Sequence, residues 1–147
     1  MCDIVRQNAY DLYRYLGPGH MEKVYENGLV HRLTKSSLSV QQQLQLSVQD
    51  EDGTEIGNLI PDLLIENFLI VECKSVQQII PVHEAQILGY LRSANLKYGL
   101  LINFGTHRFS VKRYISTPFQ RQNPLQRESR PSENGFGHEG AQKGPPL

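Results

Sequence analysis

Hydrophobic side chains recur every three to four positions in two stretches near the start of the chain. In the first stretch they share one helical face, formed by Val5, Ala9, Leu12, Tyr13 and Leu16. Gly17-Pro18-Gly19 interrupts this spacing, which returns between about residue 21 and residue 35. The pattern predicts two amphipathic helices joined by a short turn, each with an apolar face that must pack against another element.

From residue 38 the spacing of the apolar positions changes to two, which is typical of β-strands. Three strands are predicted at residues 38–48, 56–65 and 68–74. Two further strands are predicted at residues 98–104 and 109–115. The first of these two is apolar on both faces, so we expect it in the interior of a sheet.

A third helix is predicted between the two groups of strands. It begins at Pro81, because proline is well tolerated in the first helical turn, and it ends near residue 94. Its expected buried side consists of Val82, Ala85, Leu88, Gly89 and Leu91. The order is therefore two helices, three strands, one helix and two strands. This order predicts an α/β fold in which a mixed sheet with one helical crossover is flanked by helices on both faces.

The composition changes near residue 117. Residues 116–147 contain five of the eight prolines and four of the twelve glycines, with almost no periodic apolar positions. Such a segment cannot bury enough apolar surface to offset the entropy lost on ordering. We therefore expect one folded domain at residues 1–116, followed by a flexible Pro/Gly-rich tail at residues 117–147.

Charge and cysteine content limit the function classes. The 147 residues include 15 Lys and Arg against 15 Asp and Glu, so the chain does not bind nucleic acid through overall basicity, although a local basic groove is compatible with this balance. No stretch is apolar for long enough to span a bilayer, and the first ten residues lack a signal-peptide core. Cys2 and Cys73 form neither a metal-type pair nor a disulfide framework, which favours a cytoplasmic location.

Three charged residues stand out because they occur in apolar strands. Asp62 lies within the second predicted strand, and Glu72 and Lys74 end the third, FLIVECK. Glu72 and Lys74 point to one face and Cys73 to the other, since strand side chains alternate. A two-residue turn at 66–67 would place Asp62 on the wrong face. A shared site therefore requires a three-residue turn or a bulge at residues 66–68.

These residues resemble the signature of the PD-(D/E)XK nuclease superfamily, in which Pro61-Asp62 is followed by Glu72-x-Lys74. The resemblance implies a restriction-endonuclease-like fold. It also implies a metal-dependent nuclease that hydrolyses phosphodiester bonds of nucleic acid, DNA more than RNA.

The similarity extends to a smaller family within that superfamily. Gly19-His-Met-Glu22-Lys-Val-Tyr25 resembles the GxxExxY motif, and the segments PVHEAQILGYL and YGLLINFG resemble this family in order and spacing. The similarity covers residues 3–115. The complete set, a helix Glu, PD, ExK and then Gln86-x-x-x-Tyr90, is much more specific than the PD…ExK pattern alone.

The resemblance implies a site for Mg²⁺, with Mn²⁺ as an alternative. This hard cation prefers oxygen ligands, and it supplies charge neutralisation at a phosphate. Asp62 and Glu72 would be direct ligands and the backbone carbonyl of Cys73 a third. Glu22 would complete the ligand set or hold a water beside the ion.

The remaining residues of the resemblance are polar but are not metal ligands. Lys74 would orient the attacking water and stabilise developing negative charge, because a lysine ammonium is a poor base near neutral pH. Gln86 and Tyr90 lie one helical turn apart and would support the substrate or Lys74.

Each residue also has a simpler structural explanation. Asp62 could be a turn residue, Glu72 and Lys74 a surface pair, and Glu22 an acid favoured by the helix dipole. Tyr25 and Tyr90 could belong to the core. Two other functions therefore stay open: a catalytically silent nucleic-acid-binding module, and a protein-interaction module that uses a sheet edge and the tail. A nuclease this small could also require a homodimer or a partner protein.

Overall fold

A computed structural model describes residues 1–105 and 108–118 of the chain. Two helices come first, α1 (Cys2–Leu16) and α2 (Glu22–Lys35). Five strands follow, namely β1 (Val40–Gln42), β2 (Leu46–Gln49), β3 (Glu55–Leu59), β4 (Leu63–Ile65) and β5 (Leu69–Lys74). Helix α3 (Pro81–Ala94) then leads to β6 (Tyr98–Asn103) and β7 (Ser110–Ile115).

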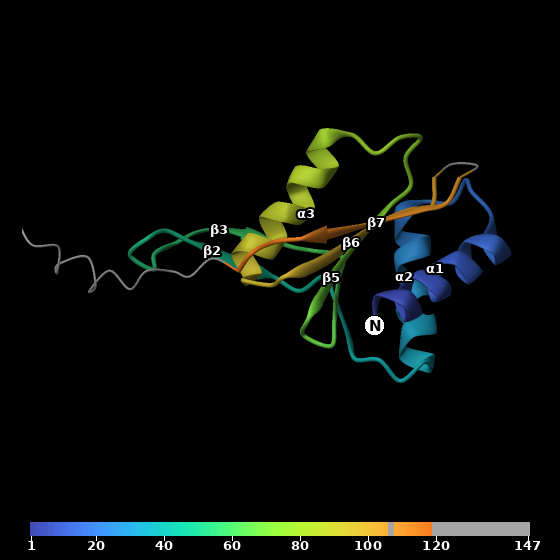
Figure 1. Cartoon of the computed structure of the whole chain (residues 1–147), viewed down its shortest axis with the longest axis horizontal. Helices are drawn as coiled ribbons and strands as arrows, with labels where there is room; N and C mark the ends of the chain where they lie inside the picture. The colour runs from blue at the N-terminus through green and yellow to red at the C-terminus, as the bar shows by residue number, and fades with distance from the viewer. Residues whose placement is uncertain (106–107, 119–147) are drawn as a thin grey trace, which may run out of the picture.

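The main sheet is mixed and has the strand order β1-β4-β5-β6-β7. Strands β5 and β6 are parallel and are connected by α3, whereas the other neighbouring pairs are antiparallel. Helices α1 and α2 lie on one side of this sheet and α3 on the other (Figure 1). The predicted α/β class, the single crossover and the restriction-endonuclease-like arrangement are confirmed.

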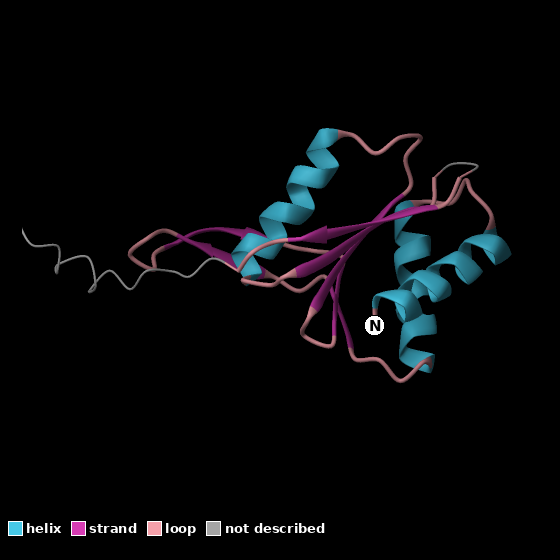
Figure 2. Ribbon diagram, in the orientation of Figure 1, coloured by secondary structure: helices cyan, strands magenta, loops and turns pink. Residues whose placement is uncertain are grey.

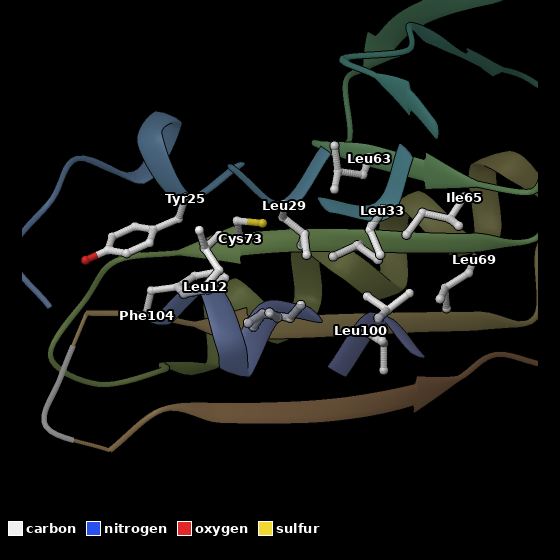
Figure 3. Close-up of a cluster of buried hydrophobic side chains, with 14 residues drawn as sticks. Leu12, Tyr25, Leu29, Leu33, Leu63, Ile65, Leu69, Cys73, Leu100 and Phe104 are labelled. Carbon is white, nitrogen blue, oxygen red and sulfur yellow. The ribbon is translucent and has the colours of Figure 1, made fainter. Parts of the chain in front are cut away.

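Each face of the sheet has its own hydrophobic cluster. The larger cluster joins α1 and α2 to one face and includes Leu12, Tyr25, Leu29, Cys73 and Phe104 (Figure 3). The smaller cluster joins α3 to the opposite face through Leu64, Ile70, Ile87, Leu91 and Leu101. Successive residues of β5 alternate between these two clusters. The strand is therefore apolar on both faces from Leu69 to Val71, before Glu72 and Lys74.

Two of the predicted strands are each divided in two. Five strands therefore precede the third helix, and the prediction of three is wrong. The first is interrupted at Gln43, which has a left-handed backbone with φ 55. The second is interrupted at Pro61, which has no amide hydrogen for a sheet ladder. As a result, β2 and β3 pair with each other in a separate hairpin that extends away from the main sheet (Figure 2).

The buried side of α3 also differs from the prediction. Its buried residues are Ile87, Tyr90 and Leu91, whereas Val82 is 62% exposed and Ala85 is exposed. The first turn of α3 therefore contributes little to the core. Within the described residues, no helix combines the length and the apolar character required to cross a bilayer.

The β4–β5 hairpin sets which side chains share a face. Leu63 pairs with Val71 and Ile65 with Leu69, so the connecting loop contains three residues, Glu66–Phe68. Glu66 and Asn67 adopt left-handed conformations there, with φ 53 and 52. The predicted odd-length turn is confirmed. Continuing this register by one residue places Asp62 opposite Glu72, on the face that α3 covers.

Candidate active site

Asp62 and Glu72 contact each other through the backbone at the end of the β4–β5 pair. The Asp62 amide donates a 2.7 Å hydrogen bond to Glu72 Oε1. The Cys73 amide donates a 2.8 Å hydrogen bond to Asp62 Oδ2. Asp62 is only 9% exposed and Glu72 only 2%. These two backbone hydrogen bonds hold the buried carboxyl groups in place at the ends of the two strands.

Burial and mutual repulsion make these acids difficult to ionise. Desolvation, followed by the charge of Asp62, raises the pKa of Glu72 to about 8. Desolvation also raises the pKa of Asp62, and the charges of Glu26 and Glu22 add to this rise. A cation bound beside the pair would therefore favour the ionised form of both carboxyl groups.

Lys74 extends the site toward α3. Its Nζ donates a 2.9 Å hydrogen bond to Gln86 Oε1 and lies 3.9 Å from Glu72 Oε2. Gln86 Nε2 in turn donates a 2.8 Å hydrogen bond to the hydroxyl of Tyr90. Gln86 and Tyr90, the site residues predicted on the third helix, therefore lie beside Lys74. Tyr90 has a dual position, because its ring belongs to the core and its hydroxyl meets Gln86.

Cys73 separates the two charged residues of β5 and points to the opposite face. Its side chain is fully buried in the cluster beneath α1 and α2 (Figure 3). Burial, and then the charges of Asp62, Glu72, Glu26 and Glu22, raise the pKa of this thiol well above its ordinary value. The cysteine side chain is thus a packing group.

Glu22 occupies the first turn of α2 and is partly exposed. The turn before it is held in place by Tyr25, whose hydroxyl donates to Gly17 O at 2.5 Å and accepts from His20 N at 3.2 Å. Ser75 donates to His20 O at 3.0 Å, which ties this turn to the chain after β5. The charge of Glu22 raises the pKa of both members of the acid pair.

Sequence reasoning missed two polar residues beside Asp62. Glu26 lies one turn after Glu22 on α2 and is only 3% exposed. Gln43 contacts both Glu26 and Asp62 through its side-chain amide. The spacing of Glu22 and Glu26 placed them on one helical face, a signal that was available. Gln43 occurs within three successive glutamines, and nothing in the sequence distinguished it from its neighbours.

A comparison with protein-family models matches residues 1–114 to the PD-(D/E)XK nuclease superfamily. The chain belongs to this superfamily. No curated protein and no solved structure matched the chain. Pro61-Asp62 and Glu72-x-Lys74, the sequence signature of this superfamily domain, lie together at one end of adjacent strands.

Nucleases of the PD-(D/E)XK superfamily generally use divalent metals, and the acids present here are of the type that such ions require. Glu72 Oε1 accepts the hydrogen bond from the Asp62 amide, and Glu72 Oε2 lies 3.9 Å from Lys74 Nζ. Within the described ranges, no three His, Cys, Asp or Glu side chains form a compact group that could hold a metal. The donor chemistry of Asp62 and Glu72 thus fits a hard cation, although Glu22 does not close a three-acid set around them.

Proposed function

We propose that the chain is a metal-dependent nuclease that hydrolyses phosphodiester bonds of nucleic acid, DNA more than RNA. The observation that carries this proposal is the buried pairing of Asp62 with Glu72, two carboxyl groups from adjacent strands with Lys74 beside them. A purely structural role would not account for three ionisable groups in this interior position, because burying charge is costly unless it is paired or functional.

Asp62 and Glu72 would hold the cation, Mg²⁺ or Mn²⁺, with the Cys73 backbone carbonyl as a further oxygen donor. Glu22, which does not close a three-acid set around the pair, would hold a water beside the ion. When bound, a divalent cation supplies charge neutralisation at the phosphate. The backbone amides of Asp62 and Cys73, which donate to Glu72 and Asp62 respectively, keep both carboxyl groups oriented before substrate arrives.

Lys74 would act on the reacting groups directly. Its side chain is 13% exposed, so most of it is covered by the surrounding residues. There it would orient the attacking water and stabilise negative charge that develops on the phosphate. Gln86 Oε1 accepts a hydrogen bond from the ammonium, and the Tyr90 hydroxyl accepts one from Gln86 Nε2, so these two residues limit the positions available to the ammonium.

We also assign the chain to the GxxExxY family within the superfamily, with Gly19, Glu22 and Tyr25 as the motif residues. Tyr25 is fully buried and stacks on Phe104 with ring centroids 4.6 Å apart. Its hydroxyl holds the turn that precedes α2. In this assignment Tyr25 has a structural role, and Glu22 is the residue of the motif that faces the chemistry.

We assign residues 1–116 to the nuclease-like domain. The predicted tail, residues 117–147, lies almost entirely outside the described residues. Both cysteines are free thiols, which agrees with the cytoplasmic location that we propose. A second copy of the chain or a partner protein would supply additional surface for gripping a duplex.

Cleavage assays with purified variants test this function. Single- and double-stranded DNA and RNA would be incubated with Mg²⁺ or Mn²⁺, and rates compared between the wild type, Lys74→Ala and Asp62→Ala. We expect each change to lower the rate roughly 100- to 1,000-fold, since each removes electrostatic stabilisation of the reaction. Lys112→Ala is the matched control, because that lysine is exposed and pairs with Glu84 on α3. Cleavage that survives all three changes equally would show a contaminant and overturn the proposal.

A catalytically silent nucleic-acid-binding module is the second candidate. It is favoured by the absence, among the residues described, of a compact three-residue metal group. In the same experiment, this candidate predicts that the wild type binds a labelled oligonucleotide and leaves it intact with either cation.

A further inference from the structure

Gln43 makes three contacts that converge on Asp62 and its surroundings. Its backbone amide donates to Asp62 O at 2.9 Å. Its side-chain Nε2 donates to Asp62 Oδ1 at 3.2 Å and to Glu26 Oε1 at 2.7 Å. A side-chain amide has two hydrogens and can serve both acceptors. Gln43 makes these contacts with a left-handed backbone, φ 55. Residues other than glycine, asparagine and aspartate rarely adopt this conformation.

Glu26 fixes the position of the Gln43 amide. This carboxylate is buried, and its Oε1 accepts hydrogen bonds from Lys23 Nζ at 3.0 Å, Gln42 Nε2 at 2.9 Å and Gln43 Nε2 at 2.7 Å. Charged acceptors form stronger hydrogen bonds than neutral ones. Glu26 therefore restrains the amide that reaches Asp62, while Lys23 and Gln42 share the task of compensating its buried charge.

The two oxygens of Asp62 have different partners. Oδ2 accepts from the Cys73 amide within the sheet, and Oδ1 accepts from Gln43 outside it. One hydrogen bond alone leaves the carboxylate free to rotate about its last bond, whereas two bonds on different oxygens fix its plane. Groups that hold a metal ligand in this way commonly change metal affinity when they are removed.

We propose that Gln43, restrained by Glu26, is a positioning residue that fixes the Asp62 carboxylate for cation binding. This inference rests on the proposed function, because it requires Asp62 to be a ligand. Gln43 itself touches neither the cation nor the substrate. Its contribution is to the orientation of Asp62, so its loss lowers metal affinity without removing a donor oxygen.

Mn²⁺ binding to the full chain, measured by isothermal titration calorimetry, tests the proposal. Gln43→Met keeps the side-chain length and removes the amide. Gln43→Gly removes the side chain and suits the left-handed backbone, so it provides a variant in which the turn is unstrained. We expect both changes to weaken Mn²⁺ binding roughly 10- to 100-fold. Gln42→Met is the matched control, because Gln42 Nε2 also donates to Glu26 Oε1 but its other hydrogen bond goes to Asn27 Oδ1 and not to Asp62.

Comparison of the variants separates this proposal from the proposed function. Equal affinities for the wild type and both Gln43 variants, together with loss of binding in Asp62→Asn, would overturn the positioning role and leave the nuclease proposal intact. An equal loss in Gln42→Met and Gln43→Met would also overturn it, since the effect would then come from Glu26 alone. Wild-type protein that fails to bind Mn²⁺ would overturn both proposals. Urea unfolding of each variant shows that the fold is retained.

Discussion

The interior position of Glu72 makes its protonation part of the stability of the protein. Its pKa rises to about 8 in the folded chain from an ordinary value of 4.5, mainly through desolvation and then through the charge of Asp62. Between these two pH values the folded protein holds a proton that the unfolded chain has lost. Stability is therefore fully present below pH 4.5 and decreases as pH rises toward and through 8.

Unfolding in urea at several pH values measures this effect. With metal removed by a chelator, we expect the free energy of unfolding to fall by on the order of a few kcal/mol between pH 5 and pH 8.5, because over this range folding must either bind a proton at Glu72 or bury its charge. Glu72→Gln should flatten this dependence and be the more stable form at pH 8.5. A wild-type profile that is flat, or that rises over this interval, would contradict the assignment of Glu72 as a buried, repelled acid.

At the scale of elements, the ends of β5 and β6 approach so closely that only glycine fits between them. A Cβ at Gly105 would lie 2.2 Å from Val76 N and 2.4 Å from Ser75 C, and these are backbone atoms that cannot rotate away. The Asn103 side chain holds the same junction, accepting from Val76 N at 3.1 Å and donating to Val76 O at 2.9 Å. The position of the segment that follows Lys74 is therefore fixed by the end of β6, through Asn103 and Gly105.

Gly105→Ala is expected to destabilise the fold by about 1–3 kcal/mol, the usual range for overpacking. Gly89→Ala serves as the control, because a Cβ at Gly89 meets nothing within 4 Å in the middle of α3. That change should stabilise the protein by up to about 1 kcal/mol through helix propensity. Thermal or chemical unfolding of the two variants measures the opposite signs. Equal effects would mean that the β5–β6 junction is not close-packed.

Sequence periodicity predicted the elements better than their interruptions. The alternation around Leu44 and Leu46 reads as one strand through Gln43, although the chain turns there and places these residues against the α3 cluster. Periodicity reports which side chains are apolar, and both a continuous strand and a strand with a local turn can satisfy it. By contrast, Pro61 was a visible signal for the second interruption, since it cannot complete a sheet ladder.

The same limit applies to the candidate site. Asp62, Glu72 and Lys74 were visible because a charged residue in an apolar strand is unusual. Gln43 was invisible, because its importance comes from a turn that brings residues 26, 43 and 62 together, and an uncharged side chain in a polar run carries no such signal. Sequence therefore revealed the charged groups of the apolar strands and missed Glu26 and Gln43, whose roles depend on that turn.

At the scale of the whole molecule, the described residues form a two-sided core around one sheet. Its buried hydrophobic residues run from Val5 to Tyr114 and divide between the two faces of the sheet. The two clusters share strands β4, β5 and β6, so the helices on either side are coupled through the same backbone. This arrangement agrees with a single folding unit.

A chain truncated after residue 116 tests the domain boundary. We expect its free energy of unfolding to match that of the full chain within about 0.5 kcal/mol, as for changes outside a packed core. Circular dichroism during urea unfolding provides the measurement. A larger loss of stability would place part of the segment 117–147 against the domain and would move the boundary.

The three-residue loop between β4 and β5 has a consequence for how the chain can vary in length. Deleting one residue from Glu66–Phe68 would shift the register of β5 against β4 by one residue. The side chains of β5 would then face the opposite sides of the sheet. Cys73 would take the position of Glu72, and Glu72 would point into the hydrophobic cluster beneath α1 and α2. Deletions in the exposed tip at residues 50–54 would meet no such penalty, because that hairpin lies apart from the main sheet. We therefore expect natural insertions and deletions to accumulate at the tip of β2–β3 and to be excluded from the β4–β5 loop.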